Sequence, residues 1–170
     1  YEDILSVQFL SAGTERWKPQ IADALLAATG CTRLFERSDS GVRQMEGLPA
    51  VKGWLRGEGD TRVLLREHDI RLTVDVEAGH KTGYYLDQRE NRALFARLVR
   101  QLGCKSVLNC YSYTGGFSVS ALAGGATEVV SVDSSGPALA RASAHVELNG
   151  FDPAHHTALD ADVKIGRAHV

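Results

Sequence analysis

The sequence lacks long apolar runs and paired cysteines, and each absence excludes a class of protein. No stretch of about 18 consecutive apolar residues occurs, so no segment is expected to span a membrane. The first residues are acidic, and no basic segment precedes an apolar one, which argues against a secretory signal peptide. The three cysteines, Cys31, Cys104 and Cys110, form no C-x-x-C pair, a pattern that predicts reduced thiols in a cytoplasmic protein rather than disulfides or zinc ligands.

An excess of basic residues is also missing. The 170 residues include 19 Lys and Arg against 21 Asp and Glu, for a net charge of −2, and no basic stripe is visible. Charge alone therefore gives no indication of nucleic-acid binding. His155 and His156 have no ligand-spaced partners, so no metal site is expected. What remains is an ordinary globular composition, 44% hydrophobic and 24% charged, at a length that fits one or two domains.

The most informative stretch is 106–118, S-V-L-N-C-Y-S-Y-T-G-G-F-S. Its apolar start is typical of a short buried parallel strand. Gly115 and Gly116 allow a tight turn and a close approach of backbone to a ligand, and a helical spacing of apolar residues begins at Phe117. Strand, glycine turn and helix predict the front half of a mononucleotide-binding βαβ unit.

A second strand is predicted over 128–132, and it ends at Asp133. An acid at that place can accept hydrogen bonds from both ribose hydroxyls of an adenosine ligand. Asp133 comes 17 residues after Gly116, close to the spacing of about 20 that such a site needs. The alternative role for Asp133 is a cap for the helix that starts near Gly136, and one carboxylate can do both.

The glycine pattern decides which nucleotide is expected. A dinucleotide site requires G-x-G-x-x-G, whereas here the glycines are adjacent and Phe117 and Ser118 follow them. The bulky Phe117 leaves less room for a diphosphate. An adenosine ligand without phosphate, S-adenosylmethionine, therefore fits better, and a nicotinamide or flavin site is the alternative.

The predicted fold class is α/β, with the first half of a Rossmann-like sheet preceded by a small α+β domain. Leu94, Leu98 and Leu102 share one face of a predicted helix. Residues 1–78 are expected to contain a strand within 1–10 whose hairpin partner is missing, a helix over 14–28 capped by Thr14, a strand over 32–37, a loop over 38–59 and a hairpin of 62–67 and 72–77. Residues 79–164 are expected to contain a loop over 79–85, helices over 87–102, 117–124 and 137–148, and strands over 106–110, 128–132 and 157–161.

The sequence also resembles a known family. The stretches V-L-N-C-Y-S-Y-T-G-G-F-S-V-S-A-L-A-G-G-A, V-V-S-V-D-S-S and V-D-V-E-A-G-H-K-T-G-Y-Y-L-D-Q-R-E-N-R look like the bacterial 23S ribosomal RNA cytosine-5 methyltransferases of the large-subunit methyltransferase I type. The resemblance runs from Tyr1 to about Val163 and includes Asn109, where most class I methyltransferases carry Asp. It implies S-adenosyl-L-methionine as cofactor and 23S ribosomal RNA as partner. It also implies an N-terminal PUA-type RNA-binding domain in the family, which we expect not to lie within these 170 residues.

The resemblance and the motif together predict a set of cofactor-binding residues. Asn109 would orient a water or the ligand amino group, or else satisfy loop backbone. Lys81, Gln88 and Arg89 would meet the methionine carboxylate, or else form a solvated helix start. Asp162 matches the acid that reads the adenine amino group, or else is a solvated loop acid. The full set is Lys81, Gln88, Arg89, Asn109, Tyr111, Ser112, Tyr113, Thr114, Gly115, Gly116, Asp133, Ser134 and Asp162.

The resemblance also implies a chemistry that this chain does not complete. Methylation at cytosine C5 needs a cysteine thiolate that adds to C6 and a base that removes the C5 proton. Cys110 is interpreted as a small core residue at a strand end rather than as this nucleophile, because the family takes its nucleophile and an acidic-Pro-Pro motif from later strands. The chain is therefore expected to be an inactive fragment, with residues 165–170 as a non-native tail.

Two rival functions stay open at this point. The first is a methyltransferase with another target, such as guanine N2 or a small molecule. The second is an RNA-binding module without catalysis. Strand 106–110 is also expected to be an uncovered sheet edge, which predicts poor solubility.

Overall fold

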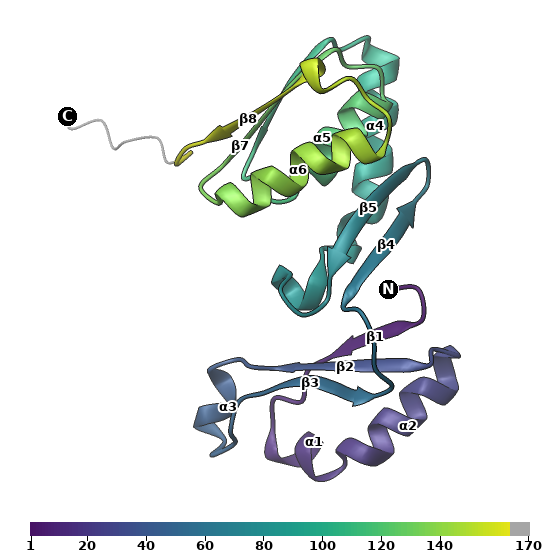
Figure 1. Ribbon diagram of the computed structural model, residues 1–170, viewed down its shortest axis with the longest axis vertical. Helices are drawn as coiled ribbons and strands as arrows, with labels where there is room; N and C mark the ends of the chain where they lie inside the picture. Colours follow the sequence, from purple (N-terminus) through teal and green to yellow (C-terminus); the bar gives the residue numbers. More distant parts are fainter. Residues whose placement is uncertain (164–170) are drawn as a thin grey trace, which may run out of the picture. The chain divides into compact units, whose positions relative to one another are not determined.

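The computed structural model describes residues 1–163, apart from the side chains of Lys81 and Thr82, and Figure 1 shows its ribbon. The chain forms two compact units, one of Tyr1–Leu65 with Thr73–Tyr85 and one of Arg66–Leu72 with the chain from Leu86 onward. This division differs in detail from the boundary expected after residue 78, and the assignment of the parts as domains stays a prediction. The expected non-native tail, 165–170, lies outside the described residues.

The first unit is built on a three-stranded sheet in the order β1-β2-β3. β1 runs parallel to β2, and β3 pairs with β2 in the antiparallel sense, so β1 is an edge strand of the described sheet and its missing hairpin partner stays a prediction. Helix α2 connects the two parallel strands and packs on β2. The buried apolar residues include Ile4, Leu34 and Phe35. The elements are β1 (Ile4–Val7), α1 (Ala12–Arg16), α2 (Lys18–Thr29), β2 (Arg33–Ser38), α3 (Val42–Met45) and β3 (Val51–Arg56).

The helix expected over 14–28 is in fact two helices. Ser11 is the N-cap of α1, and Thr14 completes a capping box at the third helical position instead of acting as the cap itself. Trp17 separates the helices and is more than half exposed. Pro19 lies in the first turn of α2, where its missing N–H costs no hydrogen bond. The proline therefore starts a new helix and does not continue the old one.

The prediction of a loop over 38–59 was wrong, because this range contains α3 and β3. Gly53 lies in the middle of β3 and weakens its strand signal, since glycine has low strand propensity. A cross-strand aromatic pair compensates: the rings of Phe35 and Trp54 meet edge to face with their centroids 5.1 Å apart. Tertiary packing, which local sequence does not report, forms this strand.

The hairpin consists of β4 (Arg62–Glu67) and β5 (Ile70–Asp75), joined at His68 and Asp69. Its second strand begins two residues earlier than expected. The predicted inward residues Leu72, Val74 and Val76 are all buried.

The second unit holds a parallel sheet in the order β6-β7-β8, of which Figure 1 labels β7 and β8. Helices α5 and α6 pack against the strands, and α4 packs on α5. This arrangement confirms the predicted α/β class with the first part of a Rossmann-like sheet. The elements are α4 (Arg89–Leu102), β6 (Ser106–Cys110), α5 (Gly116–Ala123), β7 (Glu128–Asp133), α6 (Gly136–Leu148) and β8 (His156–Asp160).

Several apolar side chains of this unit face outward. Leu108 on β6 is 65% exposed, and Cys110 is exposed as well, so Cys110 is not the core residue that the sequence suggested. The leucines expected to share a face of α4 do so, but Leu94, Leu98 and Leu102 are exposed. β6 forms an edge of the described sheet, as expected. None of the described helices is long and apolar enough to cross a bilayer.

A buried ion pair fixes α4 to the tip of the hairpin. The guanidinium of Arg92 donates two hydrogen bonds to the carboxylate of Glu67, at 2.7 and 2.6 Å. Both side chains are only 3% exposed. Such a pair adds little net stability compared with an apolar pair, but breaking it leaves an uncompensated buried charge.

We expect Glu67→Gln to lower the free energy of unfolding by about 3–5 kcal/mol in urea denaturation, because Arg92 keeps its charge without a counter-ion. The double change Glu67→Leu with Arg92→Met should recover most of that loss. Glu90→Gln, which removes the exposed ion pair of Glu90 with His68, should cost no more than about 1 kcal/mol. A Glu67→Gln protein as stable as the wild type would contradict this account.

Candidate functional site

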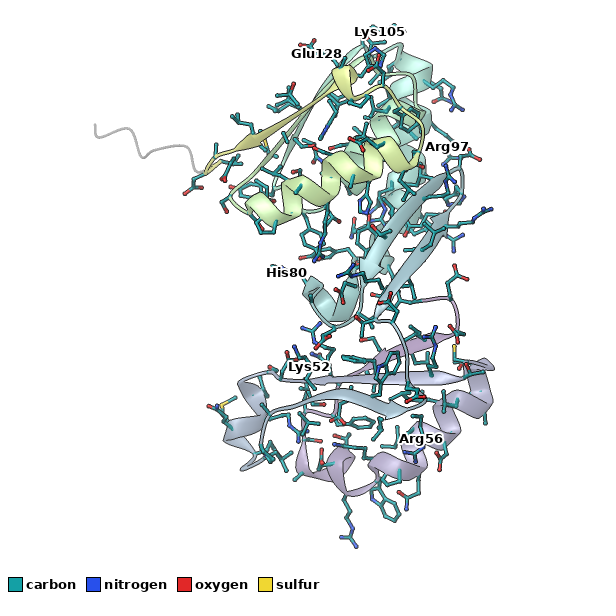
Figure 2. All side chains as sticks on the ribbon, viewed as in Figure 1. Lys52, Arg56, His80, Arg97, Lys105 and Glu128 are labelled. Carbon is teal, nitrogen blue, oxygen red and sulfur yellow. The ribbon has the colours of Figure 1, made fainter. Side chains whose placement is uncertain are left out.

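Most of the predicted site residues lie at the carboxyl-terminal end of the strands of the parallel sheet. Register pairs Cys110 with Val132 and Asp133 with Asp160, so the three strands end at the same edge. Lys105 and Glu128, labelled in Figure 2, mark the opposite edge, where β6 and β7 begin. The segments that follow the carboxyl ends of the strands are 111–116, Ser134 and 161–163. In open α/β sheets, this edge is where ligands bind.

The loop after β6 has an unusual backbone. Tyr111 and Tyr113 have φ angles of 54° and 48°, and Gly115 has 74°. Side chains larger than glycine rarely adopt this left-handed region, and holding them there costs about 1–3 kcal/mol each. Strained backbone of this kind clusters at ligand sites, and alternating left-handed residues can turn backbone N–H groups into a shared concavity.

Three hydrogen bonds from neighbouring elements hold this loop. The Ser112 amide donates to the Val132 carbonyl at 3.0 Å, and the Tyr113 amide donates to Asp133 Oδ2 at 2.8 Å. The Thr114 carbonyl lies 2.8 Å from His145 Nδ1, on α6. His145 is buried, and nothing in the sequence singled it out from the other residues of its helix.

Asp133 connects the loop to the start of α6. While Oδ2 accepts the amide of Tyr113, Oδ1 accepts the amide of Ser135 at 3.0 Å. The N-cap of α6 is Ser135, not Asp133, because its side chain accepts from the Ala138 amide. Asp133 is half-buried, and each of its oxygens has a second lone pair. The carboxylate can therefore still accept hydroxyl donors.

Ser112 supplies an independent sign that this loop receives a ligand. Its hydroxyl is buried, with the residue only 6% exposed, and it has no hydrogen-bond partner among the described residues. Buried hydroxyls without a partner are rare and call for a specific explanation. A polar ligand or water beside the loop would satisfy it, so the residues present fit an adenosine-type cofactor.

Gly115 has a packing role that the sequence did not indicate, and its approach to a ligand stays a prediction. A Cβ atom at this position would lie 2.6 Å from the Cβ of Ala142, on α6. The glycine is thus required by the close packing of the loop on α6, together with its positive φ.

Asn109 belongs to a chain of polar side chains that crosses the sheet. Its Nδ2 donates to Ser118 Oγ at 2.8 Å, which lies 2.6 Å from Ser131 Oγ. Ser131 Oγ lies 2.8 Å from Nε2 of His156, at the start of β8. Burial lowers the pKa of His156 below its ordinary value of 6.5. The Asn109 side chain therefore has a hydrogen-bond partner within the protein, Ser118. No residue spacing in the sequence pointed to the other members of the network.

Of the remaining predicted residues, two lie at the start of α4 and two are exposed after β7 and β8. Gln88 exchanges hydrogen bonds with Asp87 and Asn91 at the start of α4. Arg89 lines a groove between α4 and the hairpin tip. Ser134 and Asp162 are exposed at the carboxyl edge, and the side chain of Lys81 lies outside the described residues. Within 1–163, no group of three or more His, Cys, Asp or Glu residues is arranged to hold a metal ion.

Replacing Gly115 by alanine tests the packing of the loop. The positive φ should cost about 1–2 kcal/mol of unfolding free energy, and the clash with Ala142 a further 1–3 kcal/mol or so. Gly103→Ala is the matched control, since Gly103 has a φ of 64° and no neighbouring atom within 4 Å of the place that a Cβ would take. If Gly115→Ala and Gly103→Ala lose equal amounts of unfolding free energy in urea denaturation, the clash with Ala142 is ruled out.

The buried position of His156 makes stability depend on pH. Because its folded-state pKa lies below 6.5, the neutral ring stabilises the fold above that pH, and this contribution is lost as the pH falls through the folded-state value. The unfolding free energy of the wild type should therefore fall more steeply below pH 6.5 than that of His156→Gln. His155→Gln should keep the wild-type profile. Parallel profiles for wild type and His156→Gln would refute this role.

Comparison with known proteins agrees with this geometry. A family model described as S-adenosylmethionine-dependent methyltransferase matches residues 41–165. Two relatives named ribosomal RNA large subunit methyltransferase I, from Alteromonas mediterranea and Vibrio cholerae, are each 46% identical over 96% of this chain. The chain spans only 40% and 41% of their lengths.

Solved structures show the same fold. A Streptococcus mutans protein assigned to the SAM-dependent methyltransferases superposes with a TM-score of 0.78 at 29% identity, over 95% of this chain and 40% of its own. A methyltransferase-like protein solved with SAH gives the same values. A tRNA m1G37 methyltransferase from M. jannaschii shares the fold, with a TM-score of 0.70 at 19% identity, over 93% of this chain and 44% of its own. Because the family model covers most of the sequence, the chain belongs to the S-adenosylmethionine-dependent methyltransferase family.

Proposed function

We propose that this chain binds S-adenosylmethionine at the carboxyl edge of β6, β7 and β8. The observation that carries the proposal is the half-buried carboxylate of Asp133, fixed by two backbone amides and still able to accept ribose hydroxyls. Ser112 and the left-handed backbone of the loop would hold the methionine end. Asp162, exposed just beyond β8, would face the adenine.

When bound, S-adenosylmethionine supplies a methyl group on a positively charged sulfur. The task of this chain is then to orient that group. A loop held by Asp133, Val132 and His145 loses little entropy when the ligand binds, because its backbone is already fixed. Preorganisation of this kind is what positioning in methyl transfer requires.

For the whole protein, we propose methylation of cytosine C5 in 23S ribosomal RNA. The names of the relatives support a ribosomal RNA of the large subunit as substrate. The choice of cytosine C5 rests on the sequence resemblance alone. Cys110 is exposed at the end of β6, and the family nucleophile is expected in the part of the relatives that this chain does not match. The three cysteines form no disulfide, which supports a cytoplasmic setting.

The rival functions predict different ligands. A methyltransferase for another base or a small molecule would share the cofactor site and differ only in the unmatched part. A non-catalytic RNA-binding module need not bind the cofactor. A nicotinamide or flavin protein would favour a dinucleotide over an adenosine thioether.

Calorimetry separates these possibilities. The wild-type chain should bind S-adenosylhomocysteine and not NADH. Asp133→Ala should weaken binding about a hundredfold, since two hydrogen bonds to a charged acceptor are lost. Asp160→Ala removes an exposed acid from the paired position on β8 and should change the affinity by no more than about twofold.

Ser112→Ala distinguishes a ligand role from a structural one. Its hydroxyl has no partner among the described residues, so its removal should leave stability unchanged or raise it. The affinity for S-adenosylhomocysteine should nevertheless fall about three- to tenfold. Undetectable binding by the wild type, or full affinity in both Asp133→Ala and Ser112→Ala, would overturn the cofactor proposal.

A further inference from the structure

A second concave surface lies away from the loop after β6. It is a groove with a volume of about 320 Å³, formed by the hairpin tip, α4 and the end of α5. Two interactions fix its walls: the Glu67–Arg92 ion pair, and two hydrogen bonds between the Asn149 side chain and the backbone of Arg71, at 2.8 and 2.7 Å. The small side chains of Ala93, Ala96 and Ala123 line it. The groove is therefore a built feature of the second unit.

Arginines dominate this groove. Arg89, Arg97 and Arg100 occur at a helical spacing that places them on one side of α4, and all three line it. Figure 2 labels Arg97 on α4, beside the hairpin tip. Arg89 and Arg97 are exposed and form no hydrogen bond or ion pair with any residue in 1–163. The guanidinium of Arg100 donates one hydrogen bond to the Ala123 carbonyl.

The charge of the surface is opposite to that of the chain. An adjoining hollow of about 270 Å³ adds Arg66 and Arg71. Of the acids nearby, Glu67 is neutralised by Arg92, and Glu90 lies 3.5 Å from His68. The two hollows together hold six arginines and three acids, in a chain whose net charge is −2. The arginines are Arg66, Arg71, Arg89, Arg92, Arg97 and Arg100, and the acids are Glu67, Asp69 and Glu90.

We propose that this groove binds the phosphate backbone of the RNA substrate. Planar guanidinium groups suit phosphate oxygens, which they bind through paired hydrogen bonds. Arg89 and Arg97 lie about 12 Å apart along the helix axis, farther than one phosphate group can bridge, so the surface fits an extended polyanion. His68 is the one aromatic side chain that lines the two hollows, beside six arginines, so charge-assisted contacts to phosphate outnumber surfaces on which a base could stack.

This inference rests on the proposed function for its choice of RNA as the polyanion. No basic stripe is visible along the sequence, because the arginines of the groove are divided between residues 66–71 and 89–100 and are diluted by acids elsewhere. Only the fold brings the two groups together.

Binding of a fluorescein-labelled RNA hairpin of mixed sequence, followed by anisotropy, tests the proposal on the full chain. Arg97→Glu and Arg89→Glu should each weaken binding about tenfold or more. Each should also reduce the slope of log K against log salt, between about 50 and 200 mM, by about 1. Arg16→Glu, an equal charge change at an exposed arginine of the first unit, should leave affinity and slope close to those of the wild type.

Calorimetry with S-adenosylhomocysteine on the same variants keeps the two proposals separate. Unchanged uptake by Arg97→Glu, together with weaker RNA binding by Arg97→Glu and Arg89→Glu, supports the groove. If the wild type takes up no S-adenosylhomocysteine but shows the arginine-dependent RNA binding, the cofactor proposal fails and the groove stands. The groove proposal is overturned if the wild type does not bind RNA, if both variants bind it normally, or if polyglutamate competes as well as RNA at equal charge.

Discussion

The site depends on one carboxylate that receives two backbone amides. Asp133 ends β7, and its oxygens accept the amides of Tyr113 and Ser135. The first bond compensates for the left-handed backbone of the loop, which would otherwise relax. The second fixes the turn into α6. On that helix, Ala142 lies against Gly115 and His145 contacts the Thr114 carbonyl. A ligand that uses Asp133 thus meets a surface whose shape is set before it arrives.

Polar groups inside the second unit are costly, and the structure satisfies most of them in connected sets. Asn109, Ser118, Ser131 and His156 form one such set across the sheet. A network of this kind specifies one register of strands and helix, since any shift would leave several buried polar atoms unpaired. Ser112 is the exception among these residues, and it lies where the proposed ligand would bind. The unsatisfied atom therefore lies at the proposed cofactor site.

The sequence predicted the second unit better than the first because its signals are local. Apolar runs, paired glycines and a strand ending in Asp133 correspond to β6, the loop and β7. β3 was missed because Gly53 weakens its pattern, and the stabilising contact of Trp54 with Phe35 joins distant parts of the chain. His145 shows the same limit, because its contact with the Thr114 carbonyl comes from where α6 lies against the loop. The sequence singled out Arg89 but not its place in the groove between α4 and the hairpin tip.

The most direct measurement of the central claim is the change in backbone amide NMR shifts on addition of S-adenosylhomocysteine. The account predicts that the changes concentrate at Ser112, Tyr113 and Thr114 and at Asp133 and Ser134, with the amides of 89–100 little affected. Changes confined to 89–100, or no changes at saturating ligand, would contradict it.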